Sequence, residues 1–151
     1  DLWRVKLDSL GGTWLVAKPL TLMNLSGNCV QPLLAWHRIA PQSLIVVHDE
    51  LDLPPGSLRF KFGGGNAGHN GLKSITQQLG TPNFYRLRLG IGRPVQKGDV
   101  INWVLGRPQG TDCENWHEAM ESGLLVLEAF ADNGLEKAVA TANEETKKHM
   151  D

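Results

Sequence analysis

This sequence of 151 residues is poor in cysteine and has no long hydrophobic run. Its two cysteines, Cys29 and Cys113, are too few for a disulfide framework. We therefore expect a reduced, cytoplasmic setting, with a single bridge between them as the alternative. No apolar run is long enough to span a membrane, and neither end resembles a signal peptide. Hydrophobic residues at 41% and charged residues at 21% are typical of a globular protein. We expect one domain over residues 1–151.

Negative charge is missing from the middle of the chain, although the formal net charge is only −1. No aspartate or glutamate occurs between residues 53 and 98, whereas acidic residues outnumber basic ones from residue 112 onward. Clustered Lys and Arg attract phosphates, so the middle of the chain is predicted to bind an anionic partner. The alternative is an ordinary solvated basic face. The cations of this basic segment are Arg59, Lys61, Lys73, Arg86, Arg88, Arg93 and Lys97.

Residue patterns in the first third of the chain predict a hairpin, a helix and a strand. Residues 3–8 and 13–17 are strand-like, and the glycines between them predict a hairpin turn. A helix follows, with Ser26 as its predicted N-cap, and Pro32 implies either a kink or a later helix start. Residues 43–47 form an apolar run with β-branched residues, which is typical of a buried central strand.

The remaining patterns complete an α/β arrangement. Residues 58–62 and 84–91 alternate as strands, with one face apolar and the other basic. Between them lies a glycine-rich loop, then a helix that opens at His69 or Asn70 and ends at Leu79. Helices are also predicted over residues 99–105, 116–131 and 135–142. We expect a twisted mixed sheet sandwiched by helices.

The candidate functional residues gather in residues 46–72. Asp49 lies at the carboxyl end of a predicted strand, where open α/β sheets place functional groups. His69 and Asn70 stand between glycines that let a ligand approach the backbone, or else they cap the helix. Asn24 is either a turn residue or an amide that binds a ligand carbonyl. This segment has the character of a binding or catalytic site.

Metal and nucleotide cofactors are disfavoured by the same segment. His48, Asp49, Glu50 and Asp52 do not make a metal site, because consecutive strand residues point to opposite faces. The glycine-rich loop lacks the Lys-Ser/Thr ending of a P-loop and the context of a dinucleotide fold. The remaining histidines lie on predicted helices or in a polar tail, and we predict no catalytic role for His37, His117 or His149.

Four collinear motifs resemble those of the bacterial-type peptidyl-tRNA hydrolases. The resemblance extends from about Trp3 to the last helix. It implies a hydrolase that cleaves the ester bond between peptide and tRNA to recycle tRNA, acting as a cytoplasmic monomer in translation without metal or organic cofactor. The motifs are LMNLSG at residues 22–27, HDELDLPPG at 48–56, GGGNAGHNGLK at 63–73 and FYRLRLGIG at 84–92.

The resemblance also implies roles for individual residues. Asp49 matches the aspartate that orients the catalytic histidine, and Asn24 and Asn70 match asparagines that bind the peptide and the 3′ end of the substrate. Leu22 stands where the family often has phenylalanine, which keeps an apolar wall but loses a stacking face. The other implied roles are substrate binding by Met23 and His69 and a tRNA-phosphate clamp formed by Lys61 and Arg88.

One part of the family pattern does not occur in this sequence. The family opens with a strand, a Gly-x-x-Asn-Pro-Gly loop and an Arg-His-Asn-x-Gly motif that carries the catalytic histidine. We therefore expect an N-terminally truncated chain without its general base, inactive alone and able to self-associate through the exposed edge. The alternative is a non-catalytic RNA-binding module on the same scaffold.

Overall fold

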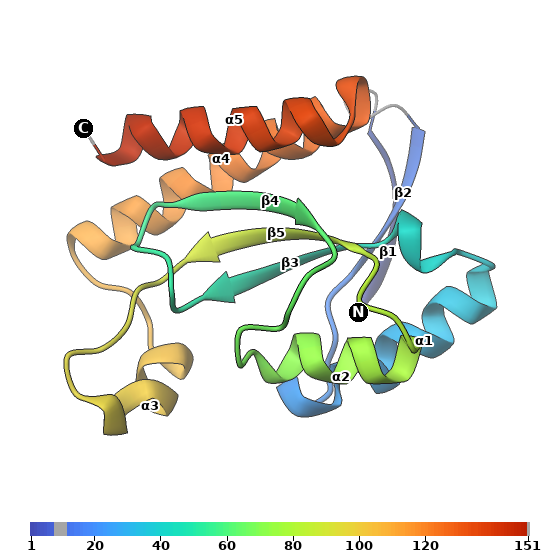
Figure 1. Cartoon of the computed structure of the whole chain (residues 1–151), viewed down its shortest axis with the longest axis horizontal. Helices are drawn as coiled ribbons and strands as arrows, with labels where there is room; N and C mark the ends of the chain where they lie inside the picture. Colours follow the sequence, from blue (N-terminus) through green and yellow to red (C-terminus); the bar gives the residue numbers. More distant parts are fainter. Residues whose placement is uncertain (8–11, 151) are drawn as a thin grey trace. The chain divides into compact units, whose positions relative to one another are not determined.

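The computed structural model describes residues 1–7 and 12–150 (Figure 1). The chain groups into two compact units, which are treated separately below. Unit 1 comprises Asp1–Val46 and Phe62–Tyr85, and unit 2 comprises Val47–Lys61 and Arg86–Asp151. One domain over residues 1–151 stays a prediction. No helix among the described residues combines the length and hydrophobicity needed to cross a bilayer.

Unit 1 begins with an antiparallel hairpin of β1 (Leu2–Leu7) and β2 (Gly12–Ala17). The register places Leu2 opposite Ala17 and Val5 opposite Trp14. The predicted hairpin is therefore confirmed in its two strands. Its predicted turn falls mainly on residues 8–11, which lie outside the described part of the chain.

Unit 1 also contains two α-helices that pack together: α1 (Ser26–His37) and α2 (Asn70–Leu79). They approach closely at Gly27, whose N–H donates to Ser74 Oγ at 2.9 Å. A Cβ at Gly27 would overlap the carbonyl oxygen of Ser74, so only glycine permits this spacing. Apolar side chains from both helices and from the flanking segments form the core, namely Val30, Leu34, Leu72, Ile75 and Phe84, with Ile39, Leu44, Val46 and Leu79 packed against them.

The start of α1 differs from the sequence prediction. Leu25 is the N-cap, and it makes no side-chain capping bond. Ser26 is already helical, and its hydroxyl donates instead to the carbonyl of Met23 at 2.8 Å. The prediction of Ser26 as N-cap is therefore wrong. A helix start after Pro32 is also wrong, because the helix runs through this proline.

Three strands form a mixed sheet in the order β3-β5-β4: β3 (Ile45–Glu50), β4 (Leu58–Phe62) and β5 (Tyr85–Gly90). β3 and β5 are parallel, since Tyr85 N–H donates to Leu44 and Ile91 N–H donates to Glu50. β4 is antiparallel to β5, as the arrows in Figure 1 show. The α/β class with a mixed sheet is as predicted. The central position predicted for residues 43–47 is wrong, because β5 is central in the described sheet.

Unit 2 covers one face of its strands with the longest helix, α4 (Thr111–Asn133). Gly123 of α4 faces the side chains of Leu58 and Leu87, and an added Cβ would lie 3.4 Å from Leu87. The rings of Phe60 and Phe130 pack at a centroid distance of 5.3 Å. The apolar face predicted for these strands therefore packs against a helix. Two short elements, η4 (Lys97–Asp99) and α3 (Val100–Leu105), precede α4.

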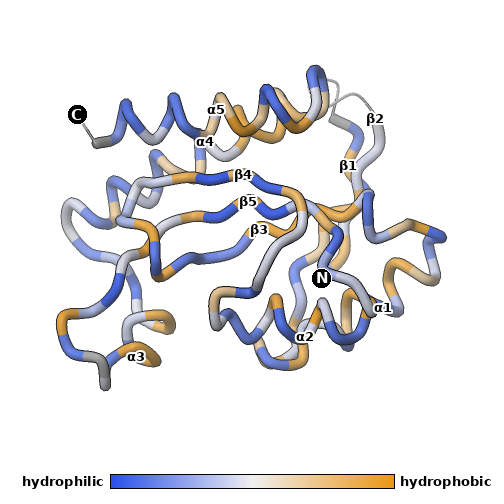
Figure 2. The backbone as a smooth tube through the Cα atoms, in the orientation of Figure 1, coloured by the Kyte–Doolittle hydropathy of each residue, from blue (hydrophilic) through white to orange (hydrophobic). Residues whose placement is uncertain are grey.

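The last helix, α5 (Leu135–Met150), packs beside α4 and is longer than the predicted residues 135–142. Its second half is largely hydrophilic in Figure 2, so hydrophobic periodicity alone placed its end too early. Polar contacts replace apolar ones there. His149 lies between Ser122 at 2.8 Å and Glu118 at 3.0 Å. The polar tail in which His149 was placed is therefore the second half of α5.

α5 also satisfies the first residue of β4. The hydroxyl of Thr146 accepts a hydrogen bond from Leu58 N–H at 2.8 Å, and it lies 3.0 Å from Leu58 O. Arg59 Nη1 donates to the same hydroxyl at 3.2 Å. Thr146 is buried and accepts the outward-facing N–H at the start of this edge strand, while Arg59 Nη1 donates to Leu58 O at 2.7 Å.

Candidate functional site

The predicted substrate-binding residues Leu22, Met23 and Asn24 lie in an exposed turn of unit 1. The turn is the short 3₁₀ helix η2 (Met23–Leu25). It is fixed by Leu25 N–H donating to Leu22 O at 2.8 Å. Leu22 is 73% exposed and Met23 is 54% exposed. An ordered turn that holds large apolar side chains in solvent suits contact with a ligand.

Gly71 brings Met23 and His69 together. A Cβ at Gly71 would lie 2.7 Å from Met23 Sδ and 2.9 Å from His69 Cε1. Both side chains therefore pack against the bare backbone of Gly71 at the first turn of α2. The structure thus joins, within unit 1, two residues that are far apart in the sequence.

His69 is the N-cap of α2, so the capping alternative is what the structure shows for this residue. Its Nδ1 accepts a hydrogen bond from Leu72 N–H at 3.2 Å. A ring nitrogen that accepts a backbone N–H carries no proton, so the neutral ring is protonated at Nε2 in this arrangement. Asn70 follows as the first residue of the helix and is exposed. Both residues are held at one helix N-terminus.

Asp49 lies in β3 and is half-buried. The neighbouring side chains, His48 and Glu50, are buried, and strand alternation places them on the opposite face from Asp49. His48 Nδ1 lies 2.7 Å from the backbone oxygen of Asp49. Among the residues that the structure describes, no group of three or more His, Cys, Asp or Glu side chains is arranged to hold a metal ion.

The predicted phosphate clamp of unit 2 is part of a cluster of four charged residues. Arg88 Nε lies 3.5 Å from Glu50 Oε2, with side-chain exposures of 20% and 3%. The backbone hydrogen bonds of β4 and β5 pair residue 63 with 84 and 57 with 90, so Lys61 stands opposite Arg86. Arg86 is fully buried. The prediction that Arg86 belongs to a solvent-facing basic side of the strands is therefore wrong. Lys61 and Arg88 are partly accessible.

Electrostatics in this charged cluster favour an added anion. Burial lowers the pKa of the Lys61 ammonium, and the positive charges of Arg88 and Arg86 lower it further. The carboxylate of Glu50 acts in the opposite direction. Burial, and then Arg88, also lower the pKa of Arg86. The positive charges of Lys61, Arg86 and Arg88 thus act on one another, and a bound phosphate would relieve their mutual repulsion.

Unit 2 also contains an exposed ion pair, between Arg93 and Asp52. Arg93 donates to Asp52 Oδ1 through Nε at 2.9 Å and through Nη2 at 2.6 Å. The hydrogen bond from Arg93 is the main reason that the pKa of Asp52 lies below its ordinary value. Both side chains are about half exposed, so this pair is a surface ion pair rather than part of the buried charged cluster.

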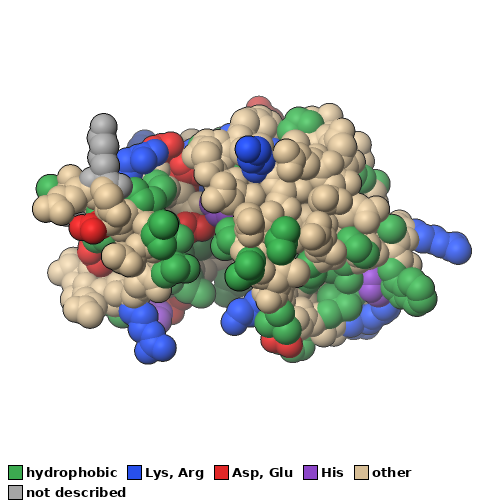
Figure 3. Space-filling model, turned by 90° about the horizontal axis from the view of Figure 1, so that it is seen from below, with side chains coloured by type: hydrophobic (Ala, Val, Ile, Leu, Met, Phe, Trp, Pro, Cys, Tyr) green, Lys and Arg blue, Asp and Glu red, His purple; other side chains and the backbone are tan. Residues whose placement is uncertain are grey.

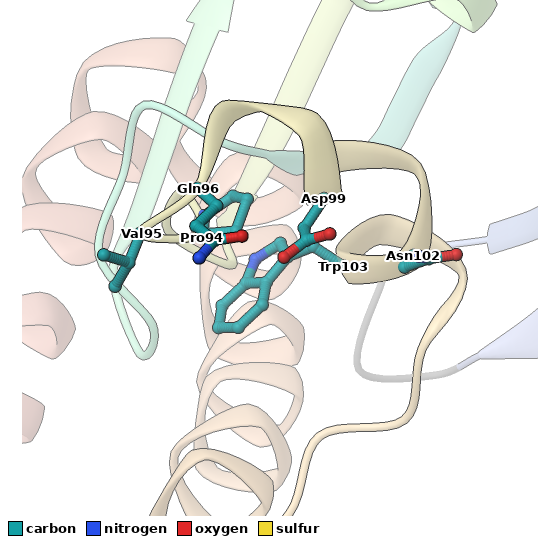
Figure 4. Close-up of a pocket in the computed structure, with 6 residues that line it drawn as sticks. All are labelled: Pro94, Val95, Gln96, Asp99, Asn102 and Trp103. Atoms are coloured by element: carbon teal, nitrogen blue, oxygen red, sulfur yellow. The ribbon is translucent and has the colours of Figure 1, made fainter.

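One hollow in the described surface lies in unit 2 around α3 (Figure 4). It has a volume of about 560 Å³, and no predicted site residue lines it. Trp103 forms one wall and donates from Nε1 to the carbonyls of Ile91 and Gly92. In Figure 3, exposed hydrophobic side chains lie in several separate groups rather than in one patch. The other residues that line the hollow are Pro94, Val95, Gln96, Asp99 and Asn102.

Sequence reasoning missed the contributions of Glu50 and Arg86 to the charged cluster. Glu50 was considered only as a metal ligand, and Arg86 only as a surface cation. The sequence shows that side chains alternate between the two faces of each strand. It does not show that β3 pairs with β5. The register across these strands is what places the carboxylate of Glu50 beside Arg88.

The fold is that of an α/β protein with a mixed sheet, with neutral groups at one helix N-terminus and a buried charged cluster on the strands. The peptidyl-tRNA hydrolase family model matches residues 3–150, and the chain belongs to this family. The peptidyl-tRNA hydrolase of Desulfovibrio desulfuricans is 67% identical over 147 residues, which are 97% of this chain and 64% of that protein. The corresponding protein of Nitratidesulfovibrio vulgaris is 52% identical over 143 residues, 95% of this chain and 71% of the relative.

A solved structure gives the same result for the fold. The crystal structure of peptidyl-tRNA hydrolase from Acinetobacter baumannii matches with a TM-score of 0.85 at 36% identity. The match covers 93% of this chain and 70% of that chain. The chain therefore spans about two thirds of the length of the relatives it matches, and 64% of the relative from D. desulfuricans.

Proposed function

We propose that this chain binds peptidyl-tRNA and contributes to hydrolysis of the ester bond between the peptide and the tRNA. The family match over residues 3–150 carries this proposal. The charged cluster of unit 2 supports it, because partly buried Lys61 and Arg88 beside buried Arg86 suit a phosphate-bearing ligand. The apolar turn of unit 1 supports it as well, because a peptide needs a wall for its side chains.

The reaction defines the work that the site residues must do. A water oxygen attacks the ester carbonyl carbon, the bond to the ribose oxygen breaks, and the proton taken from water reaches that oxygen. A histidine general base needs a fixed tautomer, and we assign this orienting role to Asp49. By the resemblance, that histidine belongs to the Arg-His-Asn-x-Gly motif, which does not occur in residues 1–151.

Neutral residues of unit 1 are assigned to the substrate itself. Asn24 and Asn70 are exposed amides that can donate to the ester carbonyl and to the oxyanion that forms from it. Leu22 and Met23 supply the apolar wall for the peptide. His69 is engaged as a helix cap, so we assign it to the wall of the binding site rather than to proton transfer.

The hydrolytic part of the proposal is tested with N-acetylated aminoacyl-tRNA as substrate. Loss of a general base typically costs about 10² to 10⁴ in rate, so residues 1–151 alone should hydrolyse it far more slowly than the D. desulfuricans relative. The measurement is release of the acylated amino acid under single-turnover conditions. Rates equal to those of the relative would show that Asp49 does not serve a histidine of the absent motif.

The tRNA-binding part is tested by the salt dependence of affinity. Removing one phosphate contact reduces the slope of log K against log salt by about 1. We expect this change for Lys61→Ala and for Arg88→Ala, and no change for the control Arg93→Ala. Equal slopes for all four proteins would refute the phosphate clamp. Binding that depends on both residues supports the clamp, both for a hydrolase and for a non-catalytic RNA-binding module.

A further inference from the structure

Glu50 is the buried carboxylate of the charged cluster, and neither the resemblance nor the sequence patterns gave it a role. It is 3% exposed, which is rare for a glutamate without a specific partner. Each of its carboxylate oxygens has a different neighbour. Oε1 accepts from the backbone N–H of Asp52 at 3.4 Å, and Oε2 faces Nε of Arg88 at 3.5 Å. The carboxylate is therefore held by the chain that follows β3.

The contact with Arg88 uses one particular part of the guanidinium. Nε lies at the base of the planar group, and it is the guanidinium nitrogen of Arg88 that is paired with Glu50 Oε2. An arginine recognises phosphate best when two of its N–H groups are directed together at the ligand. A carboxylate beside Nε favours one orientation of the guanidinium plane over others.

The backbone gives both residues a fixed base. Ile91 N–H donates to Glu50 O at 3.0 Å, so the end of β3 is joined directly to the end of β5. Arg88 lies in β5, three residues before Ile91. Strand pairing fixes the backbone positions of paired residues. The sheet therefore fixes the two positions from which the side chains of Glu50 and Arg88 extend.

The geometry points to Glu50 as a positioning residue that orients the guanidinium of Arg88 for a phosphate group of the bound RNA. This inference rests on the proposed function, because it presupposes that Arg88 contacts RNA phosphate. It adds a residue that touches no ligand itself. A simple charge argument predicts the reverse effect, since a negative Glu50 repels the phosphate that Arg88 attracts.

Variants of Glu50 separate these two effects. Glu50→Gln removes the negative charge, so electrostatics alone would tighten RNA binding, whereas loss of positioning would weaken it. Glu50→Asp keeps the charge but shortens the side chain, so only loss of positioning would weaken binding. We expect both variants to bind uncharged tRNA about tenfold more weakly than the wild type, a typical effect for coupled neighbours. Fluorescence anisotropy with labelled tRNA on the full chain measures the dissociation constants.

A double-mutant cycle identifies the residue through which Glu50 acts. In the Arg88→Ala background, Glu50→Gln should have no further effect on affinity, because the group it orients is gone. Glu145→Gln is the matched control, since Glu145 is also a buried carboxylate that contacts a cation, Lys148. This control should bind tRNA as the wild type does. Circular dichroism melts establish that each variant is folded, and Glu50→Asp decides the question if Glu50→Gln does not fold.

The outcomes distinguish this inference from the proposed function. Weak binding by both Glu50 variants, with no added effect beside Arg88→Ala, supports the positioning role. If Arg88→Ala weakens binding but the Glu50 variants bind normally or more tightly, the positioning role is wrong and the phosphate clamp stands. If Arg88→Ala binds like the wild type, the clamp is wrong and the role of Glu50 falls with it. Additive losses in the double variant would also overturn the positioning role.

Discussion

The two compact units present functional groups in opposite ways. Unit 1 places neutral side chains at a short turn and at a helix N-terminus, where local backbone bonds fix them. Unit 2 places charged side chains on paired strands, where burial and neighbouring charges determine their behaviour. The positions of the neutral side chains follow from the sequence over a few residues. The positions of the charged side chains depend on which strands pair, and the strength of their interactions depends on pH and salt.

The largest effect is expected from the core of unit 1. Phe84 is fully buried among the apolar side chains of this unit. Phe84→Ala should lower the free energy of unfolding by about 3 to 5 kcal/mol, because the cavity adds to the lost transfer energy. Urea unfolding measures the change. Leu20→Ala is the control, since Leu20 is exposed and should change stability by less than about 0.5 kcal/mol.

A pH-dependent loss of affinity is expected from unit 2. The pKa of Lys61 is lowered, so this lysine loses its proton below the ordinary lysine pKa of about 10.4. A bound phosphate favours the protonated form, so tRNA affinity should fall as pH rises toward that value. The full loss of one charge-assisted hydrogen bond is about 1.5 to 3 kcal/mol, or roughly 10- to 150-fold in affinity.

Lys61→Arg is the matched control for this titration. An arginine stays charged throughout the alkaline range, so the variant should keep its affinity where the wild type loses it. Dissociation constants for tRNA, measured from neutral pH upward toward the ordinary lysine pKa of about 10.4, test the difference. If tRNA affinity changes with pH in the same way for both proteins, Lys61 does not belong to the phosphate clamp. The proposed difference between the two units would then lose this support.

A smaller effect on stability is expected where the two helices of unit 1 meet. Gly27→Ala would place a methyl group against the backbone of Ser74, so α1 and α2 would have to separate. Overpacking of this kind typically costs about 1 to 3 kcal/mol. Gly65→Ala is the control, because nothing lies within 4 Å of a Cβ at that position. The melting temperatures of the two variants are compared. Equal values would mean that α1 and α2 accommodate the added methyl group without loss of stability.

The helix cap gives a further test of backbone-fixed groups. His69→Ala removes the acceptor for Leu72 N–H and should cost about 1 kcal/mol. His69→Asn should restore most of this loss, because asparagine is a strong N-cap residue. Chemical denaturation of both variants separates the cap from other contacts of the imidazole. A destabilised Asn variant would show that the ring is needed for more than capping.

The smallest effect is expected at the exposed ion pair of unit 2. Asp52→Asn should lower stability by about 0.2 to 1 kcal/mol at neutral pH, because both partners are solvent-exposed. The pKa of Asp52 is lowered, so its contribution is present above the ordinary aspartate pKa of about 3.9 and is lost as pH falls through the folded value. The difference in melting temperature between wild type and variant should therefore be smaller at pH 3 than at pH 7. A constant difference would mean that the pair is not the cause.

Sequence patterns predicted the class of fold, the hairpin strands and a helix that opens at His69 or Asn70. These features depend on periodicity, on glycine placement and on capping, all of which act over a few residues. The position of β3 at the edge of the described sheet, and the burial of Arg86, were not predictable in this way. Both depend on strand order, which is set by contacts between distant segments.

The same distinction applies to the candidate site. Asn24 and Asn70 were found because each stands in a recognisable motif, and the structure places both in exposed positions. Glu50 was passed over because a carboxylate in a strand has no local signature for its partner. The pairing of Glu50 with Arg88 needs the register between β3 and β5. A buried charge was therefore the least predictable part of the site.

Thr146 has a consequence for association between molecules. β4 is an edge strand, and an edge with free donors and acceptors is a template for another chain. The Thr146 hydroxyl receives Leu58 N–H and lies against Leu58 O, so α5 stands where a further strand would begin to pair. The Thr146 hydroxyl thus hinders the pairing of β4 with a strand of another molecule. Without α5, the outward-facing N–H and carbonyl groups at the start of β4 would lack this partner and could pair with another chain.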